Sequence, residues 1–167
     1  MGFASFAYAE SPSADSVKAA YLHRFASYVE WPAQVSAEIP FVIGVVDADE
    51  LADQLERLLA EKQVQGRTWV VRRVTRAEQL DGLRILYVSP RSFRLTRALR
   101  AMALSRPILI VTDVHDGLDG GAVINFIDGD RGVRFEISLI AADRCGLKID
   151  AALLSVAARV ERRPDNS

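Results

Sequence analysis

Residues 132–160 read GVRFEISLIAADRCGLKIDAALLSVAARV, and this stretch decides the fold of the chain. A strand pattern over 133–137 runs with almost no loop into a short helical pattern, which Gly146 breaks before a second helix begins. Ionisable side chains lie at the junctions between these elements, at Glu136, Lys148 and Asp150. Such junctions are where a fold normally displays polar groups to a partner. The stretch therefore predicts closely connected strands and helices, with charged residues placed for binding.

Upstream of this stretch, strand and helix patterns alternate along the chain. Continuous apolar runs, typical of strands that are buried on both faces, occupy 41–46, 85–88 and 108–112. A β-rich run at 68–74 follows a turn at Gly66. Helical patterns with one apolar side separate these runs. This alternation predicts an α/β fold, a three-layer sandwich with a mostly parallel sheet of about six strands.

The end of the sheet is predicted to be a C-terminal antiparallel hairpin. A turn cluster, DGDRG at 128–132, separates the strand patterns at 122–127 and 133–137. Glycine and aspartate in this arrangement are typical of a tight turn between two paired strands.

Two helix boundaries follow from local signals. Asp15 or Ser16 can cap the first helix, and Pro32 is expected to end it, because the residue before a proline is pushed out of the helical region. A later helix is expected over 91–104, where apolar residues recur on one side.

Length and composition indicate one globular domain, which we place at 15–161. The chain has 167 residues, of which 50% are hydrophobic and 26% charged, and no linker or low-complexity segment divides it. Residues 1–14 are interpreted as a signal-peptide remnant or a disordered N-terminus, since Ala7-Tyr8-Ala9 has the small-x-small pattern of a signal-peptidase site. Residues 162–167 are predicted to be a disordered tail.

The charge balance does not indicate nucleic-acid binding. The formal net charge is −1 and the sequence pI is about 6.1. No apolar run approaches the ~20 residues that a membrane span needs. The single cysteine, Cys145, excludes an internal disulfide bond and is interpreted as a buried, inert thiol.

Candidate catalytic and metal-binding residues have simpler structural explanations. The nucleotide-binding motifs G-x-x-x-x-G-K-[ST] and G-x-G-x-x-G are absent, and neither His23 nor His115 lies near a nucleophile motif. The metal-like cluster consists of Asp113, His115, Asp116 and Asp119. Its spacing matches no calcium loop, and a solvated turn accounts for it. We therefore predict that the protein is not an enzyme and holds neither a metal nor a cofactor.

A phosphorylatable receiver domain is one alternative for an α/β chain of this size. The predicted carboxyl ends of the strands offer Asp47, Asp49 and Thr112, and Lys148 follows later. The strand before Ser89-Pro90, however, ends without a carboxylate, so the phosphorylation chemistry has no acceptor. Helix capping explains the two aspartates equally well.

Aromatic residues gather near the end of the first helix, at Phe25, Tyr28 and Trp31, just before Pro32. We expect Phe25 to pack in the core. Tyr28 and Trp31 are candidates for an interface, because amphipathic rings at a helix end often anchor one.

Two segments of the chain resemble the YfiR/HmsC-like family. Lys18-Ala19-Ala20-Tyr21-Leu22, with Phe25, Tyr28 and Glu30-Trp31-Pro32, is similar to its K-A-A-[FY]-L…F…[YF]-x-x-W-P opening. Val133-Arg134-Phe135-Glu136-Ile137 resembles its V-x-F-E-[IV] strand, and Gly146-Leu147-Lys148-Ile149 continues the match. The resemblance spans about residues 17–160.

The resemblance implies a function for the whole chain. Members are described as periplasmic repressors that bind the periplasmic sensory domain of a membrane-bound diguanylate cyclase, which lowers cyclic-di-GMP signalling and biofilm formation. An outer-membrane lipoprotein can sequester them, they form homodimers without catalytic activity, and a small-molecule ligand has been proposed. By resemblance, Glu136, Lys148 and Asp150 would bind the partner, with Glu30 and Trp31 near them. We expect these residues to form one protein-binding face.

Two departures from the family pattern bear on this expectation. The chain cannot form the internal disulfides of the best-studied member, and Glu30 and Asp150 are acidic where that member is basic or histidine-like. These departures leave any small-molecule specificity of the family untransferred to this chain. The alternative function is a small-ligand-binding sensor domain that feeds a two-component or other signalling system. A receiver-like phosphoprotein and a hydrolase are the further alternatives.

Overall fold

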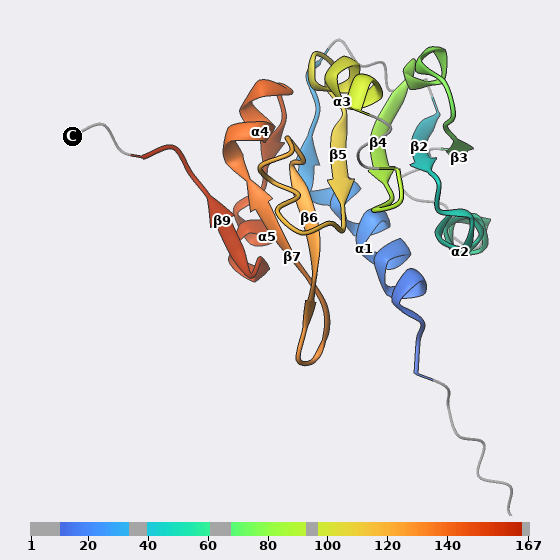
Figure 1. Ribbon diagram of the computed structural model, residues 1–167, viewed down its shortest axis with the longest axis horizontal. Helices are drawn as coiled ribbons and strands as arrows, with labels where there is room; N and C mark the ends of the chain where they lie inside the picture. Colours follow the sequence, from blue (N-terminus) through green and yellow to red (C-terminus); the bar gives the residue numbers. More distant parts are fainter. Residues whose placement is uncertain (1–10, 34–39, 61–67, 93–96, 165–167) are drawn as a thin grey trace, which may run out of the picture.

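A seven-stranded sheet forms the middle layer of the molecule (Figure 1). The computed structural model describes residues 11–33, 40–60, 68–92 and 97–164. In their order across the sheet, the strands are β3 (Trp69–Arg73), β2 (Phe41–Val46), β4 (Leu83–Val88), β5 (Leu109–Thr112), β6 (Ile124–Gly129), β7 (Gly132–Ser138) and β9 (Arg159–Glu161). All neighbouring strands are parallel except the β6–β7 pair. The predicted fold class is confirmed, and β9 makes the sheet one strand wider than expected.

Helices cover both faces of this sheet. One face carries α1 (Ala14–Tyr28), α2 (Asp49–Ala60), α4 (Leu139–Arg144) and α5 (Ala151–Val156). The other face carries the short 3₁₀ helix η1 (Ala77–Leu80) and α3 (Arg97–Leu104). A separate two-stranded antiparallel sheet joins β1 (Val29–Glu30) to β8 (Lys148–Ile149). The molecule is therefore the predicted three-layer sandwich, with a small additional sheet between segments that are distant in sequence.

The larger core lies between the sheet and α1. Leu22 and Phe25 of α1 are fully buried, which confirms the expected core position of Phe25. The Phe25 ring meets the Phe135 ring edge-on, with 5.2 Å between their centroids, and Tyr21 meets the same ring at 5.4 Å. Aromatic pairs of this geometry are stabilising beyond the area that they bury. The first helix is thus packed directly on the closing hairpin.

The boundaries of α1 differ from the sequence prediction. Its N-cap is Ser13, whose Oγ accepts a hydrogen bond from Ser16 N at 3.1 Å, and not Asp15 or Ser16. The helix ends at Tyr28 rather than at Pro32, because Val29 already has extended backbone angles and pairs with β8. The helix therefore ends where the chain begins to pair with β8, before it reaches Pro32.

The helix expected over 91–104 is shorter at its start. Its described helical part is α3, Arg97–Leu104, and residues 93–96 lie outside the described residues. Residues 90–92 form a turn, and Arg91 N donates to Ser89 Oγ at 3.3 Å. Ser92 N also donates to Ser89 O at 3.1 Å, so the first two residues of the expected helix belong to this turn.

The antiparallel hairpin is present as predicted. Gly129 pairs with Gly132, so Asp130 and Arg131 form its two-residue turn. Gly132 has φ +108°, a conformation that glycine adopts without steric cost.

The expectations for the chain ends lie largely beyond the described residues, which exclude 1–10 and 165–167.

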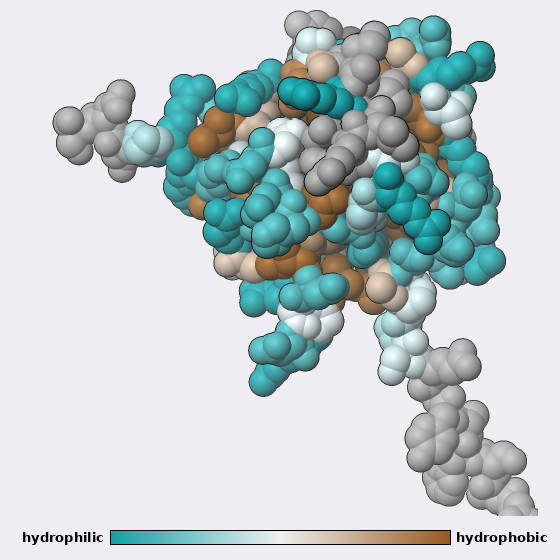
Figure 2. Space-filling view, viewed as in Figure 1, coloured by the Kyte–Doolittle hydropathy of each residue, from teal (hydrophilic) through white to brown (hydrophobic). Residues whose placement is uncertain are grey.

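Figure 2 shows a mostly hydrophilic face on which hydrophobic residues appear in small, separate patches. Large exposed hydrophobic residues in the described part are Tyr28, Val70 and Val156. None of the described helices has the length and apolar character of a membrane span.

Candidate partner-binding surface

The β1–β8 sheet joins the end of the first helix to the closing stretch. Glu30 lies opposite Lys148, and Val29 lies opposite Ile149. Asp150 N donates to Tyr28 O at 2.9 Å, which extends the pairing by one residue. Four of the five predicted site residues are thereby brought into one region. We call Tyr28, Glu30, Trp31, Lys148 and Asp150 the junction surface.

Local sequence positions the β8 side of the junction surface. Gly146 has φ +69°, which lets the chain turn sharply out of α4. Leu147 then enters the core while Lys148 faces solvent. Asp150 is the N-cap of α5, and its carboxylate accepts from Ala152 N at 2.7 Å. The alternation of buried and exposed residues therefore presents the charges of this segment outward.

Trp31 anchors the β1 side. Its ring is half-buried and contacts Phe41 edge-on, with centroids 5.4 Å apart. Its Nε1 donates to the backbone oxygen of Arg84 at 3.2 Å. Much of the ring therefore supports the junction, while Tyr28, at 37% exposure, and Glu30 contribute its accessible surface.

Glu136 does not lie on the junction surface. Its neighbours Phe135 and Ile137 face the α1 side of the sheet, so Glu136 points to the opposite side. The residue is only 8% exposed. Its Oε1 accepts from Asn125 Nδ2 at 3.0 Å and its Oε2 accepts from Arg159 Nε at 2.9 Å. The expectation of one face containing all five residues is therefore corrected for Glu136, since strand alternation places it across the sheet.

Glu136 belongs to a cross-strand polar ladder, which consists of Thr112, Asn125, Glu136 and Arg159. These residues are register partners on β5, β6, β7 and β9. Thr112 Oγ1 donates to Asn125 Oδ1 at 2.9 Å, and the chain of hydrogen bonds continues through Glu136 to Arg159. The first three residues are buried. Their polar groups are satisfied by one another, as burial requires.

The polar ladder also fixes the loop after β5. The amide group of Asn125 accepts from Val114 N at 3.2 Å and donates to Val114 O at 3.0 Å. Gly117 of the same loop lies so close that an added Cβ would be 2.4 Å from Asn125 Oδ1. Sequence reasoning missed Asn125, although an asparagine inside the apolar run AVINFI was a visible signal.

A mostly buried ion pair lies at the carboxyl end of β5. Lys18 Nζ of α1 contacts Asp113 Oδ2, and both side chains are 14% exposed. Burial raises the pKa of Tyr87 above its ordinary value, and the nearby charge of Asp113 raises it further. A cavity of about 300 Å³ beside this pair is lined by Lys18, Asp113, His115, Phe126 and Asp128, among others.

The metal-like cluster of the sequence lies in this loop. His115 is 96% exposed, and its Nε2 is 3.3 Å from Asp116 Oδ2. In the described part of the chain, no three His, Cys, Asp or Glu side chains are grouped so that they could hold a metal ion.

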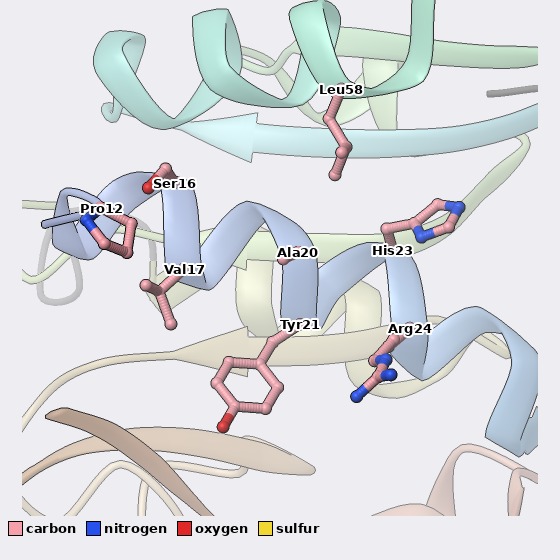
Figure 3. Close-up of a pocket in the computed structure, with 8 residues that line it drawn as sticks. All are labelled: Pro12, Ser16, Val17, Ala20, Tyr21, His23, Arg24 and Leu58. Carbon is pink, nitrogen blue, oxygen red and sulfur yellow. The ribbon is translucent and has the colours of Figure 1, made fainter. Parts of the chain in front are cut away.

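A larger, more apolar pocket of about 470 Å³ lies along α1 (Figure 3). Leu58 projects from α2 toward α1, while Tyr21 and Arg24 point away from α2. The remaining lining includes Pro12, Val17 and Ala20. The size and apolar character of this pocket are those expected of a small-molecule site.

Comparisons with known proteins match a family by sequence and solved structures by fold. The sequence profile of the YfiR/HmsC-like family matches residues 15–158, nearly the whole chain. A conserved domain protein of Vibrio cholerae O1 biovar El Tor strain N16961 has a similar structure, with a TM-score of 0.62 and 13% sequence identity. That match covers 91% of this chain and 62% of the other, so this chain spans less than two thirds of that protein. No curated protein matches the chain in sequence.

Proposed function

Because the chain belongs to the YfiR/HmsC-like family, a regulatory family known for periplasmic control of diguanylate cyclases, we propose that it represses such an enzyme. In this proposal the chain acts in the periplasm and binds the periplasmic sensory domain of an inner-membrane diguanylate cyclase. Binding lowers cyclic-di-GMP output and biofilm formation. An outer-membrane lipoprotein that competes for the chain would relieve repression, and the chain acts as a homodimer.

The pairing of Glu30 with Lys148 is the observation that carries this proposal furthest. It merges two segments at opposite ends of the domain into one exposed surface. That surface combines charges of both signs with the rings of Tyr28 and Trp31. Charge pairs fix the register of a partner, and aromatic residues supply most of the binding energy at many interfaces.

Repression of this kind needs no reactive group. A protein that binds the inactive state of a membrane sensor more tightly than the active state shifts the sensor toward inactivity. The size of the shift is limited by the difference between the two affinities. Competition by a second partner for the same surface then reverses the effect.

The proposal is tested in two steps. Deletion of the gene in its host should raise cyclic-di-GMP and biofilm, and expression of the wild-type chain should restore both. Cross-linking in the host should then identify a cyclase whose purified periplasmic domain binds the purified chain. Unchanged cyclic-di-GMP after deletion, together with no binding to any membrane diguanylate cyclase of the host, would refute the proposal.

The apolar pocket along α1 supports a second candidate, a small-ligand sensor. Ala20 is exposed at this pocket, so Ala20→Trp should fill it without disturbing the core. Native mass spectrometry of chain purified from its host should then show a bound small molecule in the wild type and none in the variant. A wild type without bound mass would leave only the first proposal.

A further inference from the structure

The pocket along α1 is an open groove lined by side chains from two helices. Val17 and Ala20 belong to α1, and Leu58 projects from α2 toward that helix (Figure 3). Tyr21 and Arg24 leave α1 on the side away from α2. Ala20 is exposed, so the groove is open to solvent beside it. Its volume of about 470 Å³ lies within the range of roughly 300–1,000 Å³ that is typical of small-ligand sites.

The lining of this groove favours a ligand with an apolar body. Val17 and Leu58 are half-buried, and Leu58 packs against the larger core, so part of each side chain stays accessible in the groove. A ligand that covers these side chains removes apolar surface from water. Such burial is favourable and roughly proportional to the apolar area that is covered.

The charge of the groove comes from Arg24. Among the described residues that line it, Arg24 is the one with a full charge, and none is an aspartate or a glutamate. The side chain of Arg24 makes no ion pair or hydrogen bond with another described residue. A guanidinium group binds a carboxylate through two parallel hydrogen bonds. An anionic end of a ligand is therefore favoured beside Arg24, and an ammonium end is repelled.

We propose that the groove binds an apolar monocarboxylic acid of medium chain length. Its carboxylate lies at Arg24, and its hydrocarbon body lies between Val17 and Leu58. About two helical turns, roughly 10 Å, separate Val17 from Arg24 along α1, so a medium-length chain reaches from one to the other and a short acid does not. The inference rests on the small-ligand candidate under the proposed function and names the class of its ligand.

The hydrocarbon body contributes more affinity than the charge. Each buried methylene group raises the affinity by up to about fourfold. An ion pair with an exposed side chain adds at most about fivefold in total, because water and salt screen it. Arg24 is exposed, so its role is to select the head group and the orientation of the ligand.

Titration with matched probes tests this ligand class. Decanoate, decanol and decylamine share one hydrocarbon chain and differ in the charge of the head group. Calorimetric titration of the wild-type chain should give the tightest binding for decanoate and the weakest for decylamine. Hexanoate should bind more weakly than decanoate, by up to about fourfold for each methylene group removed.

Variants of the groove test its position. Arg24→Gln should weaken decanoate binding by about three- to fivefold and leave decanol binding unchanged. Arg144→Gln removes an exposed arginine at the end of α4, outside the groove, and as the matched control should change neither. Ala20→Trp should prevent binding of both probes, because the indole ring fills the groove. Ala20→Ser keeps the groove open and should bind like the wild type.

The outcomes separate this inference from the proposed function. Decanoate binding that depends on Arg24 and is lost in Ala20→Trp supports the inference, whatever the gene deletion does to cyclic-di-GMP. No decanoate binding, equal binding of the three probes, or decanoate binding that persists in Ala20→Trp overturns it. A host-derived ligand that is not a carboxylic acid, and that is absent from Ala20→Trp, would keep the small-ligand candidate and overturn only the class named here.

A second copy of the chain is the other occupant that the experiment detects. If the wild type binds no decanoate and Ala20→Trp converts a dimer to a monomer, the groove is an interface between copies, and the inference is wrong. Urea unfolding of each variant shows whether it is folded. If Ala20→Trp does not fold, the comparison of decanoate with decanol in Arg24→Gln and Arg144→Gln still decides the head group.

Discussion

Glu30 and Lys148 face each other across the two-stranded β1–β8 sheet, although they stand near opposite ends of the domain. Both residues are exposed. Opposite charges at directly opposed positions of two strands contribute only about 0.2–1 kcal/mol, so this pair adds little to stability. The pairing matters because it fixes the position of each charge on the junction surface.

Lys148→Glu should abolish repression without unfolding the protein. The substitution places two negative charges opposite each other, which lowers the free energy of unfolding by about 0.2–1 kcal/mol. Affinity for the cyclase domain should fall by about tenfold or more, because a reversed charge at an interface opposes the complementary charge of the partner. Urea unfolding and a binding titration measure the two effects separately.

The charge swap Glu30→Lys with Lys148→Glu is the control for that experiment. It should recover the lost stability, because opposite charges again face each other, but it should not recover binding. Full recovery of binding by the swap would show that only the pairing, and not the position of each charge, matters.

Loss of the central carboxylate of the polar ladder should destabilise the fold. Glu136→Ala leaves one of the two N–H groups of the buried Asn125 amide without an acceptor, because the other still donates to Val114 O, and an unsatisfied buried group costs about 1–3 kcal/mol. In a double-mutant cycle with Asn125→Ala, the two effects should not add, since both variants break the same hydrogen bond. Denaturant unfolding of the wild type, the two single variants and the double variant measures the coupling free energy between the two residues. Additive effects would mean that the two residues act independently.

Gly117→Ala should also lower stability, by about 1–3 kcal/mol, because the new methyl group would overpack a filled site. Its Cβ would lie 2.4 Å from Asn125 Oδ1 and 2.6 Å from Thr112 Oγ1. Thermal unfolding measures the effect. The cost should shrink in an Asn125→Ala background, where the contact with Asn125 is removed and only the one with Thr112 remains. An equal cost in both backgrounds would show that the contact with Asn125 is not its cause.

Tyr87 should make the protein sensitive to alkaline pH. Its folded pKa is raised above the ordinary value of 10.0, mainly by burial, so the folded state favours the neutral phenol. Stability from this group is complete below pH 10 and is lost as the pH rises toward the folded pKa. Tyr87→Phe should therefore flatten the decline of the unfolding free energy above about pH 10. An unchanged slope in the variant would contradict this assignment.

The fold class could be predicted from sequence because its signals are local. Continuous apolar runs such as Phe41–Val46 mark buried strands, and the glycines at 129 and 132 mark the hairpin turn. The end of α1 could not be predicted, since Val29 leaves the helix to pair with Ile149 at the far end of the chain. A proline signal acts within a few residues, whereas strand pairing depends on the whole topology.

The candidate site could be predicted only in part, because local signals place some of its residues and the sheet topology places the others. Lys148 and Asp150 are near each other in sequence, and their exposure follows from their positions at element ends. Glu136 was expected on the same face, but its direction depends on which side of β7 packs against α1. Its partners Asn125 and Arg159 come from two other strands, and only the register of the sheet brings them together.

The β1–β8 sheet also has a consequence for the order of folding. Closing contacts between segments this far apart in sequence costs the most loop entropy, and such contacts tend to form late. β8 follows the completed hairpin and α4 along the chain, so the junction surface needs nearly the full domain. A chain truncated before Lys148 lacks that surface, and we expect a full-length chain to acquire it late in folding. Under the proposed function, we therefore expect that an incompletely folded chain does not bind the cyclase.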